Sequence, residues 1–228
     1  MNNPKRPLTN YNRKQGADIF TFSLPRNTCL AHKTKLCFER CYGRKRVFLT
    51  HDVLGRYIKN LSDSKDPDFE SCVIDQIIRE KVDYIRIHTI GDFYSQAYFN
   101  KWVTIARICP ATKFLAYTRN WELNAYLLPD NFKLYYSVDV TTTKFNPTIH
   151  RRSTMFFPPP EVKVYAHLEP LSRPEFEGRI CSSRCSHCKT CWNGRFNIAF
   201  PIVTNLGVTY KSETLDYYSI PKRTQVKA

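Results

Sequence analysis

Four cysteines lie close together in the last quarter of the sequence. They are Cys181, Cys185, Cys188 and Cys191, with three, two and two residues between neighbours. Thiolates are soft metal ligands, and two intervening residues let a turn direct successive sulfur atoms at one centre. The run is more compact than two separate zinc knuckles and closer to the run that wraps an iron–sulfur cluster in ferredoxins. The spacing therefore predicts a metal centre, with an iron–sulfur cluster, structural zinc and a disulfide pair as the three interpretations.

Three more cysteines form a second group upstream. Cys29, Cys37 and Cys41 have seven and three residues between them, and Tyr42 follows the last thiol directly. The group begins just after a β-rich segment, 19–24, which a proline ends. Three thiols in a loop that follows a strand predict a second metal-ligating constellation.

The elements that must position these groups alternate along the chain. The pattern predicts strands at 19–24, 84–88, 114–118, 134–138, 162–166 and 196–200, and helices at 47–61, 67–78, 94–109 and 121–128. The long connection 141–160 is interpreted as a lid. Cys72 and Cys109 lie on apolar helical stripes and are interpreted as core residues. Strands that alternate with helices imply parallel βα units. We expect an α/β fold, either a TIM-like partial (β/α) barrel with a C-terminal Cys-rich module or an open sheet.

Polar residues follow several of these strands where each one ends. In parallel α/β folds the carboxyl ends of the strands share one edge, so these residues are expected on the same rim as the first cysteine loop. They are His88, Gly91, Asp92, Thr118, Arg119 and Asp139. Each also has a structural interpretation: a hydrogen-bonded rim histidine, a simple turn at Gly91 and Asp92, and an ion pair between Arg119 and Asp139.

Composition limits the class of protein. The 228 residues are 42% hydrophobic, which suits one substantial domain. We expect an irregular basic arm at 1–17 and a single α/β domain at 18–228 that includes the cluster-binding module 179–195. There is no run of about 18 apolar residues and no signal-peptide pattern, so we expect no membrane partner. Nine clustered cysteines suit ligands in a reducing compartment, which predicts the cytoplasm.

The net charge of +15 attracts polyanions. The basic residues are spread along the chain, and no RNP, helix-turn-helix or finger motif accompanies them. A nucleic-acid partner and a solvated basic surface are the two interpretations.

The order of a first strand, a three-cysteine loop ending in Cys41-Tyr42 and a helix resembles the radical SAM superfamily. Members of that superfamily hold a [4Fe-4S] cluster by three thiolates in this loop, and Gly91-Asp92 stands where they have a glycine-rich segment that contacts S-adenosylmethionine. The usual spacing there is Cys-x3-Cys-x2-Cys, whereas this chain has Cys29-x7-Cys37-x3-Cys41.

Several motifs between residues 20 and 195 also resemble the bacteriophage gene-product-88 family. They are Thr28-Cys29, Cys37 to Cys41-Tyr42, Arg86-Ile-His88 to Gly91-Asp92-Phe93, Ala116-Tyr117-Thr118-Arg119 and Cys188-Lys-Thr-Cys191-Trp192. The resemblance implies a viral or prophage origin, which would make the compartment the host cytoplasm, and a radical-SAM-like iron–sulfur protein.

The leading hypothesis is therefore a viral iron–sulfur protein with radical or redox chemistry at one or two [4Fe-4S] clusters. The upstream thiols would hold one cluster with an iron open to S-adenosylmethionine. The downstream thiols would hold a second cluster or lend the first a fourth thiolate, which would leave no open iron. The alternatives are a basic nucleic-acid-binding module and a structural viral protein, each with a structural cluster or zinc.

Overall fold

The scaffold is one eight-stranded sheet. The computed structural model describes residues 6–10, 15–29, 32–39, 41–139, 141–156, 170–173, 176–181 and 185–201. The strands are β1 (Ile19–Phe22), β2 (Tyr84–Ile87), β3 (Lys113–Thr118), β4 (Phe132–Val138), β5 (Arg152–Phe156), β6 (Pro170–Arg173), β7 (Phe176–Ile180) and β8 (Asn197–Pro201). Their order across the sheet is β1-β2-β3-β4-β5-β8-β7-β6. Each neighbouring pair runs parallel except β6 and β7, which form an antiparallel edge.

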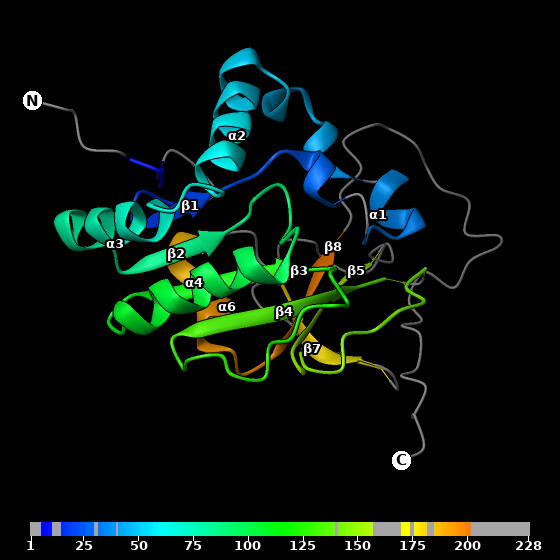
Figure 1. Cartoon of the computed structure of the whole chain (residues 1–228). Coiled ribbons are helices and arrows are strands. Elements are labelled where there is room, and N and C mark those ends of the chain that lie inside the picture. The colour runs from blue at the N-terminus through cyan, green and yellow to red at the C-terminus, as the bar shows by residue number, and fades with distance from the viewer. Residues whose placement is uncertain are drawn as a thin grey trace, which may run out of the picture.

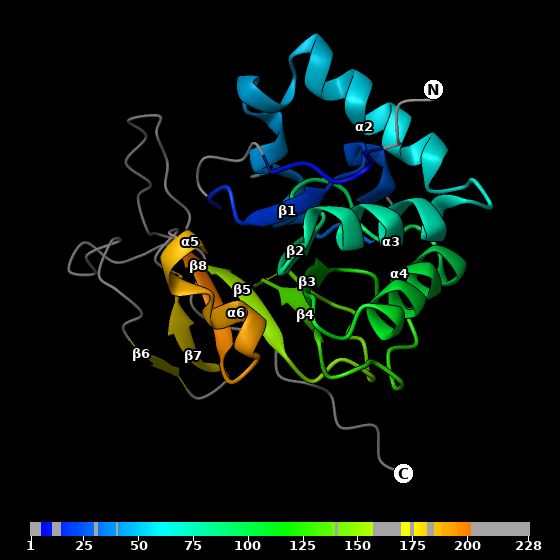
Figure 2. The ribbon, with the colours of Figure 1, turned by 90° about the vertical axis from the view of Figure 1, so that its left-hand side faces the viewer.

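Helices cover both faces of this sheet (Figure 1). They are α1 (Lys35–Glu39), α2 (His51–Asp63), α3 (Phe69–Glu80), α4 (Gln96–Ile108), α5 (Cys185–Cys188) and α6 (Thr190–Asn193), with 3-10 turns η1 (Arg26–Cys29), η2 (Tyr42–Arg44) and η3 (Arg46–Phe48). Figure 2 shows α3 and α4 on one side of β2 and β3, and α6 on the other. None of the helices in these ranges is both long and apolar enough to cross a membrane.

The main core lies between the sheet and α3 and α4. The apolar positions of α4 recur at helical spacing, and its first turn is capped because the backbone N–H of Tyr98 donates to Ser95 Oγ at 3.2 Å. Trp102, on the buried stripe of α4, meets Phe22 and Phe69 edge to face with ring centroids 5.5 Å apart. These contacts fix β1, α3 and α4 together.

A second, smaller core lies on the opposite face, beneath α6. It contains Ile19, Leu115, Tyr135, Trp192 and Ile198. Successive residues of a strand point to opposite faces, and the strands here are covered on both, so even the polar side chains of this face are enclosed. The C-terminal cysteine module is thus a structural layer of the fold.

The structure confirms an α/β fold built on a largely parallel sheet. Among the described strands, β1 and β6 are the two free edges, so the sheet is open there. The predicted strands near 19, 84, 114, 134 and 196 are present, whereas the predicted strand 162–166 lies outside the described residues. The predicted lid is partly wrong, because the stretch 141–160 contains β5, which pairs with β4 and β8.

The helix predicted at 121–128 is also wrong. Asn120 Oδ1 accepts the backbone N–H of Glu122, and Asn124 Oδ1 accepts that of Tyr126. The first of these bonds is compatible with a helix start, but the N–H groups of Tyr126 and of Ala125, which donates to Thr148 Oγ1, are bonded to side chains and not to the carbonyls of a helix. The segment therefore forms turns instead. The helix predicted from residue 47 begins at His51, since η2 and η3 occupy the preceding residues.

The N-terminal arm is partly ordered against the domain. Leu8 is buried, and its backbone N–H donates to Gln76 Oε1 of α3 at 2.8 Å. Thr9 forms an antiparallel bridge with Thr21 of β1. The arm therefore contributes to the core at Leu8.

Candidate functional site

The first thiol group lies at the carboxyl edge of β1. The chain leaves β1 through Pro25, ends η1 at Cys29, and carries Cys37 on α1 and Cys41 just before η2. Thr34 caps α1, because the backbone N–H of Cys37 donates to Thr34 Oγ1 at 3.1 Å. The Thr34 side chain thus stabilises the start of α1 from within the loop itself.

The three thiols of this group influence one another. Burial, then the neighbouring Asp92, and then Cys37 and Cys41 raise the pKa of the Cys29 thiol. Burial also raises the pKa of Cys37, whereas Arg119 lowers it. Such effects act through space, so Cys29 lies within electrostatic range of Cys37 and Cys41.

Asp92 ties the end of β2 to β3 and to the thiol loop. Its Oδ1 accepts from Thr118 Oγ1 and from the backbone N–H of Phe93, each at 2.7 Å, and its Oδ2 accepts the backbone N–H of Arg119 at 2.8 Å. The backbone N–H of Asp92 donates to Thr28 Oγ1, next to Cys29. Burial raises the pKa of Asp92 to about 6, and its three donors oppose that rise, so the carboxylate is charged at neutral pH.

A buried ion pair continues this network across β3 and β4. Arg119 Nη1 lies 2.9 Å from Asp139 Oδ2, and the Asp139 side chain is fully buried. Thr34 Oγ1 donates to Asp139 Oδ2 at 2.5 Å, and Thr141 donates to Oδ1 from both its backbone N–H and its hydroxyl. The predicted rim residues Asp92, Thr118, Arg119 and Asp139 therefore form one connected network that holds α1 in place.

Two other predicted rim residues have different surroundings. Gly91 has φ +90°, and a Cβ atom there would lie 2.6 Å from Leu24 Cβ, so the glycine allows a close backbone approach. His88 has φ +63°, and its ring lies in the main core, with Nε2 at 2.9 Å from the Tyr98 hydroxyl. Burial lowers the pKa of His88 to about 3, so its ring is neutral at physiological pH.

The second thiol group lies on the face of the sheet that α6 covers. Cys181, Cys185 and Cys191 pack against the Trp192 core, and Tyr117 donates a hydrogen bond to the sulfur of Cys191. Burial raises the pKa of Cys191 to about 12, and that hydrogen bond opposes the rise. Cys188 differs from the other three, because its thiol donates to Thr190 Oγ1 at 3.2 Å.

Trp192 fixes this module to the sheet. It is 3% exposed, its Nε1 donates to the carbonyl of Ile85 at 3.3 Å, and its ring meets that of Tyr84. The Tyr135 hydroxyl donates to the carbonyl of Cys191 at 3.1 Å. Strands β2 and β4 therefore set the position of the last thiol.

Arg86 lies near Cys185 and Cys191 of the second thiol group and near Tyr42, and it was not among the predicted site residues. Burial opposes its charge, but the neighbouring Tyr42, Tyr117, Cys185 and Cys191 outweigh that effect and raise the pKa of Arg86. Tyr42, which follows Cys41, donates from its hydroxyl to the carbonyl of Thr89. The available signal was an arginine at an alternating position of a strand that is covered on both faces.

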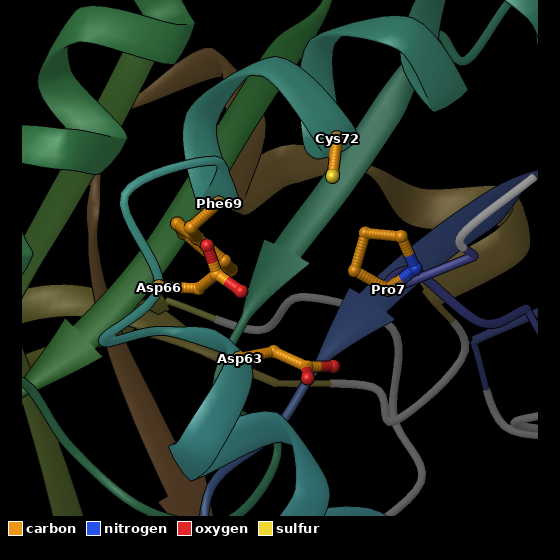
Figure 3. Close-up of a pocket in the computed structure, with 5 residues that line it drawn as sticks. All are labelled: Pro7, Asp63, Asp66, Phe69 and Cys72. Atoms are coloured by element: carbon orange, nitrogen blue, oxygen red, sulfur yellow. The ribbon is translucent and has the colours of Figure 1, made fainter.

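The remaining cysteines are separate from these groups. Cys109 is buried in the main core, as predicted from its helical stripe. Cys72 is half-buried on α3 and lines a hollow with Pro7, Asp63, Asp66 and Phe69 (Figure 3). A further hollow lies between residues 125 and 151, away from all seven predicted ligands.

The seven clustered cysteines are chemically suited to bind a metal cluster, but those in the described ranges are not arranged around one ion. All nine cysteines are free of disulfides. Within the described ranges, no three His, Cys, Asp or Glu side chains are arranged to hold a single metal ion. Soft sulfur donors grouped in threes nevertheless fit the ligand preference of iron–sulfur clusters and of zinc.

A basic surface adjoins the first thiol group. Phe38 of α1 is 44% exposed, with Lys33 Nζ 4.1 Å and the Arg44 guanidinium carbon 4.5 Å from its ring centroid. Arg46 is exposed nearby in the sequence, on η3. Part of the net positive charge is therefore combined with an accessible aromatic ring.

Comparison with known proteins agrees with the motif resemblance. The chain is 26% identical over 195 residues to the Gene 88 protein of Mycobacterium phage L5. The aligned region covers 73% of this chain and 79% of that protein. No solved structure matches the chain. The family model described as Gene product 88 matches residues 2–194. With the rim network and both cysteine groups inside that span, the chain belongs to the Gene product 88 family of phage proteins.

Proposed function

We propose that this chain is a phage iron–sulfur protein in which Cys29, Cys37 and Cys41 ligate a [4Fe-4S] cluster on a radical-SAM-like core. The observation that supports the proposal is that Cys29, at the end of η1 beyond β1, lies within electrostatic range of Cys37 and Cys41. Active sites of parallel α/β folds lie at this edge, and ordered loops there serve chemistry. The rim network holds this loop in place through hydrogen bonds at Thr34 and Thr28, as the residues around metal ligands do.

The spacing of the thiols favours a cluster over a single zinc ion. Thiolates around one zinc converge on one point, whereas those of a cubane each bind a different iron and stand further apart. The thiols here influence one another, yet the described residues form no single-ion site. A thiolate-ligated cluster supplies one-electron chemistry when bound, and the chain would supply ligation, burial and the charged rim.

The second thiol group is proposed to hold a further cluster or to complete the first. Cys181, Cys185 and Cys191 share one core with Trp192, which supports ligation by these three together. Cys188 has Thr190 as a partner and would need to exchange it for a metal.

The test is metal and acid-labile sulfide analysis of protein purified without oxygen. Wild type is expected to be brown and to contain iron and sulfide. Cys37→Ser and Cys191→Ser should each lose iron, while the matched controls Cys72→Ser and Cys109→Ser keep it. Stoichiometric zinc without sulfide would overturn the cluster assignment.

S-adenosylmethionine is the ligand to test on an iron left open by three thiolates. Its addition to the reduced protein should change the EPR spectrum of the cluster. An unchanged spectrum in protein with a full iron content would remove the radical SAM part of the proposal and leave the cluster.

A second candidate function, nucleic-acid binding, is favoured by the surface around Phe38. Aromatic rings flanked by cations bind single strands by stacking and by phosphate contacts. Phe38→Ala and Arg44→Ala should weaken binding to a single-stranded oligonucleotide, and wild-type affinity should fall steeply with salt. Tyr126→Ala is the matched control, because Tyr126 is an exposed aromatic residue far along the chain on a different loop. Equal losses in all three variants would contradict this assignment.

A further inference from the structure

Arg86 is a cation held inside the fold. Its neighbours on β2, Ile85 and Ile87, point into the main core, so Arg86 points to the opposite face, which α6 covers. Its guanidinium carbon lies 5.4 Å from the ring centroid of Tyr117. Tyr117 in turn packs against Tyr135 and Phe200, with centroids 5.3 Å away in each case. Arg86 therefore sits in an aromatic-lined layer between the sheet and the cysteine module.

The Nε atom of this guanidinium has no hydrogen-bond partner among the described residues. It is buried, and no described carboxylate forms an ion pair with the guanidinium. Arg119 offers the contrast, since its guanidinium pairs with Asp139 at 2.9 Å. Buried charges in proteins are paired or lie next to metals, so the surroundings of Arg86 require an anion.

The groups that face Arg86 identify this anion. They are Cys185 and Cys191 of the second thiol group, together with Tyr42, and the Tyr117 ring beneath Arg86 donates to the Cys191 sulfur. Metal ligation replaces thiols by thiolates, which places negative charge beside the guanidinium. We propose that Arg86 is the charge partner of the second thiolate group, at Cys185 and Cys191, and stabilises the metal bound there. This inference rests on the proposed function and assigns a residue to it.

A charge partner of the thiolates affects the metal-free and the metal-bound protein in opposite directions, whereas a residue that only fills space does not. The neighbours that raise the pKa of Arg86 do so only when they are ionised, and burial raises the pKa of the Cys191 thiol and of the Tyr117 phenol, so both are neutral at pH 7 in the metal-free protein. In that form, the burial of the Arg86 charge is not offset by an anion, so Arg86 opposes folding. In the metal-bound protein, it faces thiolates and favours retention of the metal. Replacing Arg86 by an uncharged residue must therefore stabilise the metal-free protein and destabilise the metal-bound protein.

The experiment compares wild type with Arg86→Met, Arg86→Lys and the surface control Arg79→Met, which makes the same change in net charge. Metal retention is read as the chelator concentration that removes half of the metal, under anaerobic conditions. The metal-free forms are then compared by the urea midpoint of unfolding. Arg86→Met should lose metal at a chelator concentration lower by about tenfold, the factor that a modest interaction between partly enclosed charges supplies. Its metal-free form should unfold at a higher urea concentration than wild type.

Arg86→Lys should retain metal nearly as well as wild type, because it keeps the charge, and Arg79→Met should match wild type in both measurements. Where the bound metal is redox-active, Arg86→Met should also lower its reduction potential, because a positive charge beside it has gone. Wild-type metal retention in Arg86→Met, or a lower urea midpoint of its metal-free form, would overturn the inference while the metal assignment stands. A urea midpoint that inorganic phosphate raises in the metal-free wild type and leaves unchanged in Arg86→Met would also overturn the inference. That result would make a free anion the partner of Arg86. A wild type that takes up no metal would instead overturn the proposed function.

Discussion

Replacing Gly91 by alanine should destabilise the fold through a single contact. Gly91 has φ +90°, and an added Cβ would lie 2.6 Å from Leu24 Cβ and 2.8 Å from the Leu24 carbonyl oxygen. Leu24 cannot move away easily, because its backbone N–H donates to the carbonyl of Ile90 at 2.9 Å. A left-handed conformation costs alanine about 1–2 kcal/mol. Overpacking adds about 1–3 kcal/mol. The free energy of unfolding should therefore fall by about 2–5 kcal/mol.

Gly55 provides the matched control for this substitution. It lies in the middle of α2, is exposed, and a Cβ atom there would meet nothing within 4 Å. Gly55→Ala should raise the free energy of unfolding by up to about 1 kcal/mol, because alanine is the better helix former. Urea unfolding of both variants at fixed metal content gives the comparison. A Gly91→Ala midpoint at or above that of wild type would refute the argument from the close approach to Leu24.

Three further predictions concern the rim and the module. Arg119→Met should lower the free energy of unfolding by about 3–5 kcal/mol, because it leaves the Asp139 carboxylate buried and unpaired. A loss under about 1 kcal/mol, measured by urea unfolding, would contradict the stabilising role of the ion pair. Trp192→Ala should lower the free energy of unfolding by about 3–5 kcal/mol and expose the cysteine module to limited proteolysis. The control Trp121→Ala, at a half-buried position, should leave the module protected. For Asp92, whose pKa is raised to about 6 by burial, the stabilisation of wild type relative to Asp92→Asn should be greatest near pH 4 and decline as the pH rises through 6. A flat difference between these two proteins across that range would show that Asp92 titrates normally in the fold.

Most of the rim could be predicted because it follows from a general property of parallel sheets. Asp92, Thr118, Arg119 and Asp139 each follow the carboxyl end of a strand, and adjacent parallel strands bring these ends together. No long-range information beyond the strand assignments was needed. The connected network of these four side chains is the outcome that the alternation of strands and helices predicts.

His88 departs from the prediction because of one backbone angle. Strand alternation would place it on the same face as Tyr84 and Arg86, toward α6. Its φ of +63° breaks that alternation and turns the ring toward Tyr98 and Phe93 in the main core. A left-handed conformation at a residue other than glycine has no reliable sequence signal, so the position could not be predicted.

Strand β5 was missed for a different reason. Its residues, Arg152 to Phe156, include few apolar side chains in an alternating pattern. The strand is defined by its neighbours, since β4 and β8 pair with it on either side. Propensity within the segment could not reveal a strand whose stability comes from pairing with distant chain.

The position of β8 has a consequence for the order in which the chain assembles. β8 lies between β5 and β7, so the β6–β7 hairpin joins the sheet only through the last described strand. Strands β1 to β4 and the Cys29 loop leave the ribosome well before it, and N-terminal segments can fold during synthesis. The first thiol group is therefore complete before Cys181 to Cys191 have been made. If both groups bind metal as proposed, the metal supply of a host cell would act on this protein at two separate times during its synthesis.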